Sequence, residues 1–98
     1  MWYQVETKHL NIKIYGQVQA VFFRVTAQEI ADRLNIKGFV RNEKDGAVYI
    51  EAEGTDENLE KFSRWCKDGP DAAQVEKIEV TEGPIKNFKT FDRDFADY

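Results

Sequence analysis

The spacing of hydrophobic and polar residues predicts a strand and then a helix in the first third of the chain. Leu10, Ile12 and Ile14 alternate with polar neighbours, which is typical of a strand with one buried face. Between residues 23 and 35 the apolar positions recur at helical spacing instead and predict an amphipathic helix. The apolar face of that helix contains Phe23, Ala27, Ile30, Ala31 and Leu34.

The middle of the chain has the pattern of a two-stranded hairpin. The segment "GFVRN", residues 38–42, is short, aromatic and branched, and the segment "AVYIEAE", residues 47–53, alternates again. Between them Asp45-Gly46 is a strong turn signal, because glycine tolerates a positive φ. These residues therefore predict two strands joined by a tight turn.

A second helix follows the hairpin. Thr55 precedes two acidic residues, which is typical of the residue that caps a helix N-terminus. Gly69-Pro70 ends the helical pattern. The apolar face between these signals contains Leu59, Phe62 and Cys66.

The last third predicts a further strand at "VEKIEV", residues 75–80, and offers Phe91 and Phe95 as anchors of a possible short fifth strand. The predicted order is therefore β-α-β-β-α-β. Right-handed crossovers and short connections place both helices on one face of an antiparallel sheet. We expect an α+β fold, a ferredoxin-like α/β sandwich, formed by residues 1–98 as one domain.

Composition narrows the class of protein and its partners. The chain has 98 residues, of which 42% are hydrophobic and 13% aromatic, as in a globular protein, and no apolar run is long enough to span a membrane. The net charge of −4 argues against nucleic acid or an acidic membrane as partner, because phosphate-backbone affinity needs clustered Lys and Arg. The N-terminal residues lack a signal-peptide pattern, and Cys66 is the single cysteine, which favours a cytoplasmic protein.

The segment "GQVQAVFFR", residues 16–24, links the first strand to the first helix and is a candidate anion-binding site. Backbone N–H groups at a helix N-terminus have no intrahelical partner, and the helix dipole is positive there. Gly16 allows the backbone to come close to a ligand, and the guanidinium of Arg24 matches a phosphate in shape and charge. The spacing also fits a plain connector with Arg24 facing solvent, so both interpretations stay open.

Asn42, which ends the second strand, is another candidate. An asparagine at a strand end is common turn chemistry. Its amide cannot serve as a general base, but it can orient a water molecule through hydrogen bonds. The predicted topology brings this strand end near the first helix, so Asn42 and Arg24 can converge there.

The remaining side chains offer little catalytic chemistry. His9 is the only histidine, which argues against a His-based metal site and against a Ser-His-Asp or Cys-His set. Cys66 has the spacing of a core residue, and no pair of carboxylates has a spacing that suggests acid–base work on one substrate. We therefore expect chemistry that needs no metal, no cofactor and no strong side-chain base.

Two long motifs resemble those of the acylphosphatase family. "GQVQAVFFR" resembles the family signature G-x-V-Q-G-V-x-F-R, which forms a phosphate-binding loop. "GFVRNEKDGAVYIEAEG", residues 38–54, resembles the second signature, G-aromatic-V-x-N followed by D-G-x-V and a closing glycine. The motifs have the family's usual separation, and the likeness covers residues 12–80, so the chain is identified as a member of this family.

The resemblance implies hydrolysis of acyl phosphates, the mixed anhydrides of a carboxylic and a phosphoric acid, without metal or cofactor. Arg24 would clamp the phosphoryl group, and Asn42 would orient the attacking water. The substrate itself would accept the proton of that water, so positioning and charge stabilisation carry the reaction. The backbone donors to the phosphoryl oxygens would come from Gly16, Gln17, Val18, Gln19, Ala20 and Val21.

Ala20 is the main departure from the family pattern, which usually has glycine at that position. If the backbone there needs a positive φ, the Cβ costs about 1–2 kcal/mol, and a loop that opens to relieve the strain moves its donors away from the phosphate. If φ is negative, alanine is harmless unless its methyl group meets the substrate. Asn35 also replaces a frequent glycine, and we expect that change to be nearly silent because asparagine tolerates the left-handed region.

Three alternatives remain beside this function. Ala20 allows a catalytically weakened acylphosphatase-like domain that binds a phosphorylated metabolite without turnover. The segment "KGFV", residues 37–40, faintly resembles the sheet signature of RNA-recognition motifs, but the charge is not basic and aromatics do not recur at stacking positions. The third is a domain of a larger carbamoyl-transfer protein, whereas a 98-residue chain that begins with Met favours a standalone one. We expect a monomer that acts on a small acyl phosphate.

Overall fold

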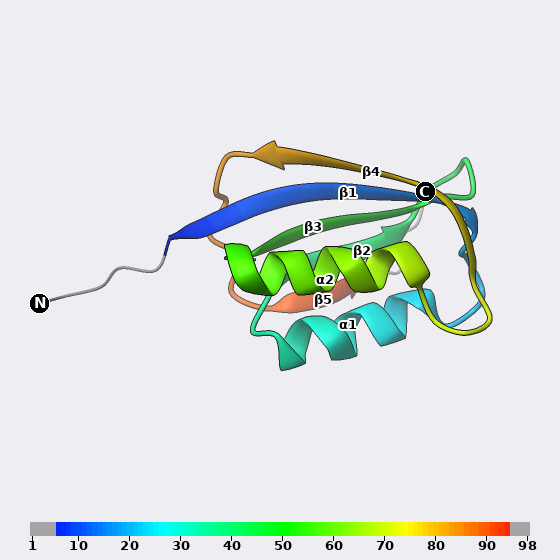
Figure 1. The fold of residues 1–98 in the computed structure, drawn as a ribbon, viewed down its shortest axis with the longest axis horizontal. Coiled ribbons are helices and arrows are strands. Elements are labelled where there is room, and N and C mark those ends of the chain that lie inside the picture. The colour runs from blue at the N-terminus through cyan, green and yellow to red at the C-terminus, as the bar shows by residue number, and fades with distance from the viewer. Residues whose placement is uncertain (1–5, 95–98) are drawn as a thin grey trace, which may run out of the picture.

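The computed structural model describes residues 6–94 (Figure 1). Every helix and strand that the sequence pattern predicts is present, including the possible short fifth strand. Phe91 anchors that strand, while Phe95 lies outside the described residues. The elements are β1 (Thr7–Gln17), α1 (Phe23–Arg33), β2 (Lys37–Asn42), β3 (Val48–Thr55), α2 (Asp56–Asp68), β4 (Gln74–Gly83) and β5 (Phe91–Asp94).

The strands form one sheet in the order β4-β1-β3-β2-β5, and both helices cover the same face of it (Figure 1). β1 pairs antiparallel with β3 and β4, and β2 pairs antiparallel with β3. β5 adds to the outer edge of β2 in parallel, so the complete sheet is mixed. The predicted ferredoxin-like α+β fold, with two helices on one face, is confirmed.

The hydrophobic core lies between the two helices and the sheet. Ile12 and Ile14 of β1 are fully buried, as their alternation predicts. Cys66 is buried on the inner face of α2, and burial raises the pKa of its thiol far above the ordinary value. This residue is therefore part of the core and presents no thiolate. The helices bury Phe23, Ala27, Ala31, Leu59, Phe62 and Cys66.

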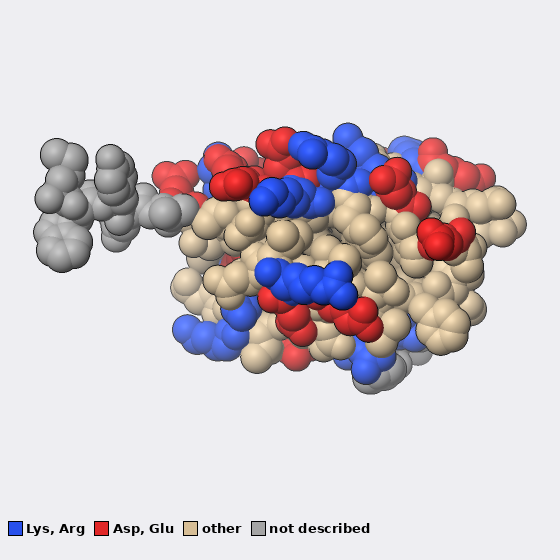
Figure 2. Space-filling model, turned by 60° about the horizontal axis from the view of Figure 1, so that its bottom comes forward, with Lys and Arg blue, Asp and Glu red and all other residues tan. Residues whose placement is uncertain are grey.

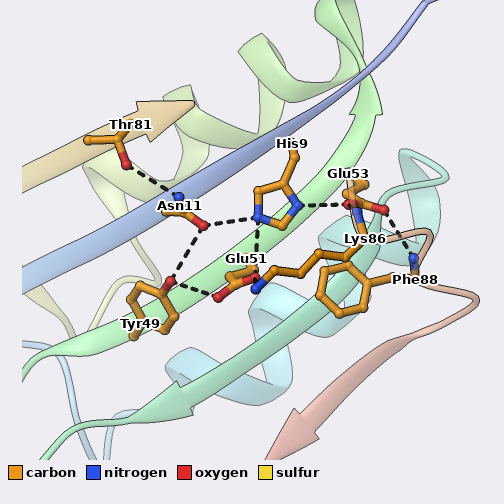
Figure 3. A network of polar contacts seen from close by, with 8 residues as sticks. All are labelled: His9, Asn11, Tyr49, Glu51, Glu53, Thr81, Lys86 and Phe88. Carbon is orange, nitrogen blue, oxygen red and sulfur yellow. Dashed lines mark hydrogen bonds and ion pairs between the residues drawn. The ribbon is translucent and has the colours of Figure 1, made fainter. Parts of the chain in front are cut away.

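The opposite face of the sheet carries a buried polar network (Figure 3). His9 is only 1% exposed, and its Nδ1 lies 2.7 Å from Oε2 of Glu53, while its Nε2 lies 2.9 Å from Oδ1 of Asn11. The backbone N–H groups of Lys86 and Phe88 donate to the two oxygens of Glu53 at 2.6 and 3.0 Å. These contacts tie the connection between β4 and β5 to the middle of the sheet.

Candidate active site

A cavity of about 220 Å³ lies where the loop between β1 and α1 meets the ends of β2 and β5. Arg24 and Asn42, which are far apart in the sequence, both line it. The short connection after α1 reverses the chain, so the end of β2, which carries Asn42, lies near the start of α1, which carries Arg24. The predicted topology leads to the same arrangement. The lining residues are Val18, Ala20, Phe22, Phe23, Arg24, Val25, Asn42 and Arg93.

Arg24 is the second residue of α1 and is held by the edge strand. Its Nη1 donates to the backbone carbonyl oxygen of Asp94 in β5 at 3.0 Å. One turn further along α1, Nε2 of Gln28 donates to the carbonyl oxygen of Phe91 at 3.0 Å. The parallel pairing of β5 with β2 therefore places carbonyl groups where they hold α1 and orient the guanidinium.

The N-terminus of α1 is open toward this cavity. Phe22 occupies the N-cap position with φ 60° and ψ 22°, no side chain caps it, and the first turn contains no acidic residue. The first backbone bond of the helix runs from the N–H of Thr26 to the carbonyl oxygen of Phe22 at 3.1 Å. The preceding N–H groups therefore have no intrahelical acceptor, and the positive end of the helix dipole is available to an anion.

The second helix begins quite differently. The hydroxyl oxygen of Thr55 accepts from the N–H of Asn58 at 3.2 Å, and Asp56 and Glu57 stand in the first turn. A side-chain cap and two carboxylates therefore satisfy the N-terminus of α2, as the sequence predicts. Of the two helices, only α1 begins without a side-chain cap or an acidic first turn, and its first residues line the cavity.

Asn42 brings an amide to the cavity from the last position of β2. The residue is 8% exposed, and its backbone pairs with Val48 in β3. Within residues 6–94 its side chain makes no hydrogen bond to another residue. A largely buried amide without a protein partner is available to hold a water molecule or a substrate oxygen.

Gln19 fixes the loop rather than facing the cavity. Its Nε2 donates to the backbone carbonyl oxygens of Glu43 and Ala47 at 2.8 and 2.9 Å. Glu43 and Ala47 close the β2–β3 turn, in which the N–H of Glu43 donates to the carbonyl oxygen of Ala47 at 2.8 Å. One side chain thus ties the β1–α1 loop to the strand end that carries Asn42. The sequence contains no signal for this role, because the partners are backbone atoms.

The other residues of the predicted phosphate loop have structural surroundings of their own. Gly16 and Gln17 belong to β1 and pair with β4. Gly16 has φ 130° at a register irregularity, and a Cβ there would collide with the backbone carbonyl of Gln74, so glycine permits the close approach of β4. The Val18 side chain is fully buried and that of Val21 packs against the core, so these residues have only backbone groups to offer a ligand.

Ala20 adopts the conformation in which alanine is strained. Its φ is 58°, in the left-handed region that the family glycine would occupy without penalty. In this conformation the residue lines the cavity together with Arg24 and Asn42. Asn35 also has a positive φ, of 55°, after the end of α1, which fits the tolerance of asparagine for this region.

Besides Phe23, which is predicted for the core, three lining residues are not predicted from the sequence pattern, namely Phe22, Val25 and Arg93. Arg93 comes from β5, whose mixture of acidic, basic and aromatic residues has no clear alternation. Phe22 was detectable in part, since it precedes Phe23 and falls outside the apolar face of α1. Only one of two adjacent aromatic residues can point into the core of an amphipathic helix.

Residues 6–94 contain neither a metal-binding cluster nor a membrane-spanning helix. That part of the chain contains no group of three or more His, Cys, Asp and Glu side chains that could hold a metal ion. None of its helices is both long and apolar enough to cross a membrane. The donors at the cavity are backbone N–H groups, two guanidinium groups and one amide, a set that suits an anion.

Comparisons with known proteins agree with this geometry. The family model for acylphosphatase matches residues 10–96. An acylphosphatase of Ligilactobacillus salivarius is 45% identical over 85 residues, which cover 86% of this chain and 94% of that protein. The crystal structure of an acylphosphatase from Bacillus subtilis is 34% identical and has a TM-score of 0.87, covering 90% of this chain and 99% of that one.

A larger protein contains a similar unit. The crystal structure of full-length HypF in its phosphate- and nucleotide-bound form has a TM-score of 0.86 and is 36% identical, over 91% of this chain and 12% of that one. The same fold and related sequence therefore occur both alone and within a longer polypeptide. The family model matches most of this chain, and the curated acylphosphatases are 42% and 45% identical to it, so the chain belongs to the acylphosphatase family.

Proposed function

We propose that the cavity between the β1–α1 loop and β5 hydrolyses acyl phosphates to a carboxylate and inorganic phosphate. The observation that carries this proposal is the meeting of Arg24, the open N-terminus of α1 and the unpartnered amide of Asn42 on one cavity. The family match and the acylphosphatase relatives support the same reaction.

The phosphoryl group binds at the positive end of α1. Within the predicted loop of residues 16–21, the backbone N–H groups of residues 18–21 donate to its oxygens together with those of the first turn of α1, and Arg24 supplies the charge and a second pair of donors. Gly16 and Gln17 contribute chiefly by setting the turn, because they pair with β4. Val18 and Ala20 are the members of this segment that line the cavity.

The amide of Asn42 orients the attacking water toward phosphorus. A P–O bond forms to the water oxygen while the bond between phosphorus and the acyl oxygen breaks, and the carboxylate leaves with the electron pair. None of the described residues that line the cavity is a His, Asp, Glu, Lys or Cys. The proton of the water therefore passes to a phosphoryl oxygen of the substrate, and catalysis consists of positioning and charge stabilisation.

Phosphate binding without turnover is the less favoured function. It was suggested by alanine in place of glycine at position 20, but Ala20 adopts the left-handed conformation and the loop stays beside Arg24 and Asn42. The relatives that match most of this chain are named acylphosphatases. We therefore propose that the strain at Ala20 lowers stability more than it lowers activity.

We further propose that residues 1–98 form one catalytic unit that acts as a cytoplasmic monomer. A buried single cysteine supports a reducing compartment. The exposed large apolar residues in the described part of the chain, Phe22, Val80 and Ile85, are too few to form an extended docking face. Light scattering at several protein concentrations measures the oligomeric state, and a stable dimer would contradict this proposal.

The decisive experiment is phosphate release from acetyl phosphate and benzoyl phosphate by the purified protein. In isotopically labelled water the label is expected in the phosphate and not in the carboxylate, because water attacks phosphorus. Addition of a chelator is expected to leave the rate unchanged. Tight binding of inorganic phosphate without release from either substrate would instead support the binding-only function.

A further inference from the structure

Phe22 and Phe23 are adjacent but have opposite surroundings. Phe23 is 2% exposed in the core, whereas Phe22 is 79% exposed, well above Val80 at 43% and Ile85 at 41%. Phe22 also has a positive φ of 60°, a conformation that is unfavourable for a bulky side chain. Neither burial nor backbone preference explains an aromatic residue at this position.

The backbone of Phe22 is nevertheless firmly held. Its carbonyl oxygen accepts from the N–H of Thr26 at 3.1 Å and from Oγ1 of Thr26 at 2.8 Å. Both bonds come from the first turn of α1, so the ring projects from the fixed end of a helix and not from the middle of a loop. A side chain presented in this way can contact a ligand at little cost in conformational entropy.

The cavity beside Phe22 has two chemically different parts. Arg24, Asn42 and Arg93 supply its polar groups, while the remaining lining residues are apolar. Figure 2 shows that charged side chains gather over the middle of the helix-bearing side, and that surface without charge prevails at its right-hand end, where Figure 1 places the start of α1. The apolar lining comprises Val18, Ala20, Phe22, Phe23 and Val25.

An acyl phosphate has the same two parts. When its phosphoryl group lies on the N–H groups and Arg24, the acyl group extends away from them toward the mouth of the cavity. We propose that the ring of Phe22 contacts the acyl group there and is the residue that distinguishes aromatic acyl phosphates from acetyl phosphate. This inference rests on the proposed hydrolysis. An aromatic acyl group can stack on the Phe22 ring in an offset or edge-to-face geometry, whereas the methyl group of acetyl phosphate offers little contact area.

The test compares kcat/KM for benzoyl phosphate and acetyl phosphate in the native protein and in Phe22→Ala. Alanine keeps the Cβ, so the backbone strain at this position is the same and only the ring is removed. The ratio of benzoyl to acetyl phosphate is expected to fall about tenfold in Phe22→Ala and to be retained in Phe22→Tyr, because the ring contact is lost only in the former. Val80→Ala, which removes an exposed apolar side chain from β4, is the matched control and should leave the ratio unchanged.

Binding of two phosphonates that cannot be hydrolysed separates recognition from turnover. Benzylphosphonate is expected to bind the native protein about tenfold more tightly than methylphosphonate, and Phe22→Ala is expected to abolish that difference. An unchanged substrate ratio together with unchanged phosphonate preference in Phe22→Ala would overturn the role of Phe22. If the native protein released phosphate from neither substrate, hydrolysis itself would be refuted, and the phosphonate preference would still decide whether Phe22 recognises an aromatic group.

Discussion

Arg24 and Asp94 join the first turn of α1 to the edge strand β5, through a hydrogen bond of 3.0 Å from Nη1 to the backbone carbonyl oxygen. This bond ties the guanidinium of Arg24 to the backbone of β5 at the edge of the cavity that Arg24 lines. β5 therefore positions a residue of the site and also forms one edge of the sheet.

Replacement of Arg24 by glutamine is expected to lower kcat/KM for acetyl phosphate by about 10²–10³-fold, because charge-assisted donors to the developing negative charge are lost. Arg24→Lys should also be severely impaired, since an ammonium cannot present two coplanar donors. Arg33→Gln removes a cation from the last turn of the same helix and is the matched control. Comparable losses in Arg24→Gln and Arg33→Gln would mean that net charge, and not position, matters.

Asn42→Ala is expected to lower kcat by about 10–10³-fold with little change in KM, because the amide acts on the water and not on the bound phosphoryl group. Asn42→Asp should raise KM as well, since a carboxylate beside the phosphate repels it. Asn58→Ala, in the first turn of α2, serves as control for loss of an amide elsewhere. A large rise in KM with unchanged kcat in Asn42→Ala would instead assign Asn42 to substrate binding.

Gln19 is expected to support activity without touching the substrate. Gln19→Leu removes both hydrogen bonds to the β2–β3 turn and should lower the free energy of unfolding by about 1–3 kcal/mol. Gln19→Glu should be worse, because its carboxylate faces two carbonyl oxygens. Chemical denaturation and kcat/KM are measured in parallel, with Gln74→Glu on exposed β4 as control. Equal stability of the Leu and Glu variants would contradict the proposed contacts.

Ala20→Gly is expected to raise the free energy of unfolding by about 1 kcal/mol, because glycine has no Cβ to strain at a φ of 58°. The effect on kcat/KM should be smaller than about threefold, since Ala20 already lines the cavity together with Arg24 and Asn42. Asn35→Gly, at a φ of 55°, provides the comparison and should gain only a few tenths of a kcal/mol because asparagine tolerates this region. A gain of tenfold or more in activity for Ala20→Gly would show that alanine distorts the site.

Much of this arrangement is predictable from the sequence because it depends on local patterns. Alternation gives the strands, helical spacing gives α1 and α2, and the order of elements places Arg24 near Asn42. The parallel pairing of β5 is not predictable in this way, because it depends on a connection that crosses the whole sheet before Phe91 becomes buried against the core. Arg93 reaches the cavity only through that pairing, so its position cannot be derived from its neighbours in the chain.

The same crossing connection depends on Glu53 (Figure 3). Burial pushes the pKa of the Glu53 carboxyl up, but hydrogen bonds from the Lys86 N–H and the His9 ring outweigh it, and the pKa lies below the ordinary value of 4.5. The pKa of Glu51, which is also on β3, is lowered as well. Burial raises this pKa, but hydrogen bonds from Lys86 and Tyr49 lower it by more. A carboxyl with a lower pKa in the folded state stabilises the fold above its unfolded pKa.

Stability is therefore expected to hold above about pH 5 and to decline as the pH falls below 4.5 through the folded pKa values of these carboxyls. Glu53→Gln should lower the free energy of unfolding at about pH 7 by about 2–3 kcal/mol, because an amide cannot accept from all the donors that face it. Since protonation removes the same interaction from the native protein, the gap between the two should narrow at about pH 3.5. Urea unfolding at both pH values measures this gap in the free energy of unfolding. Glu29→Gln, at an exposed position of α1, is the control. A gap that stayed constant with pH would show that Glu53 stabilises the connection through its shape and not through its charge.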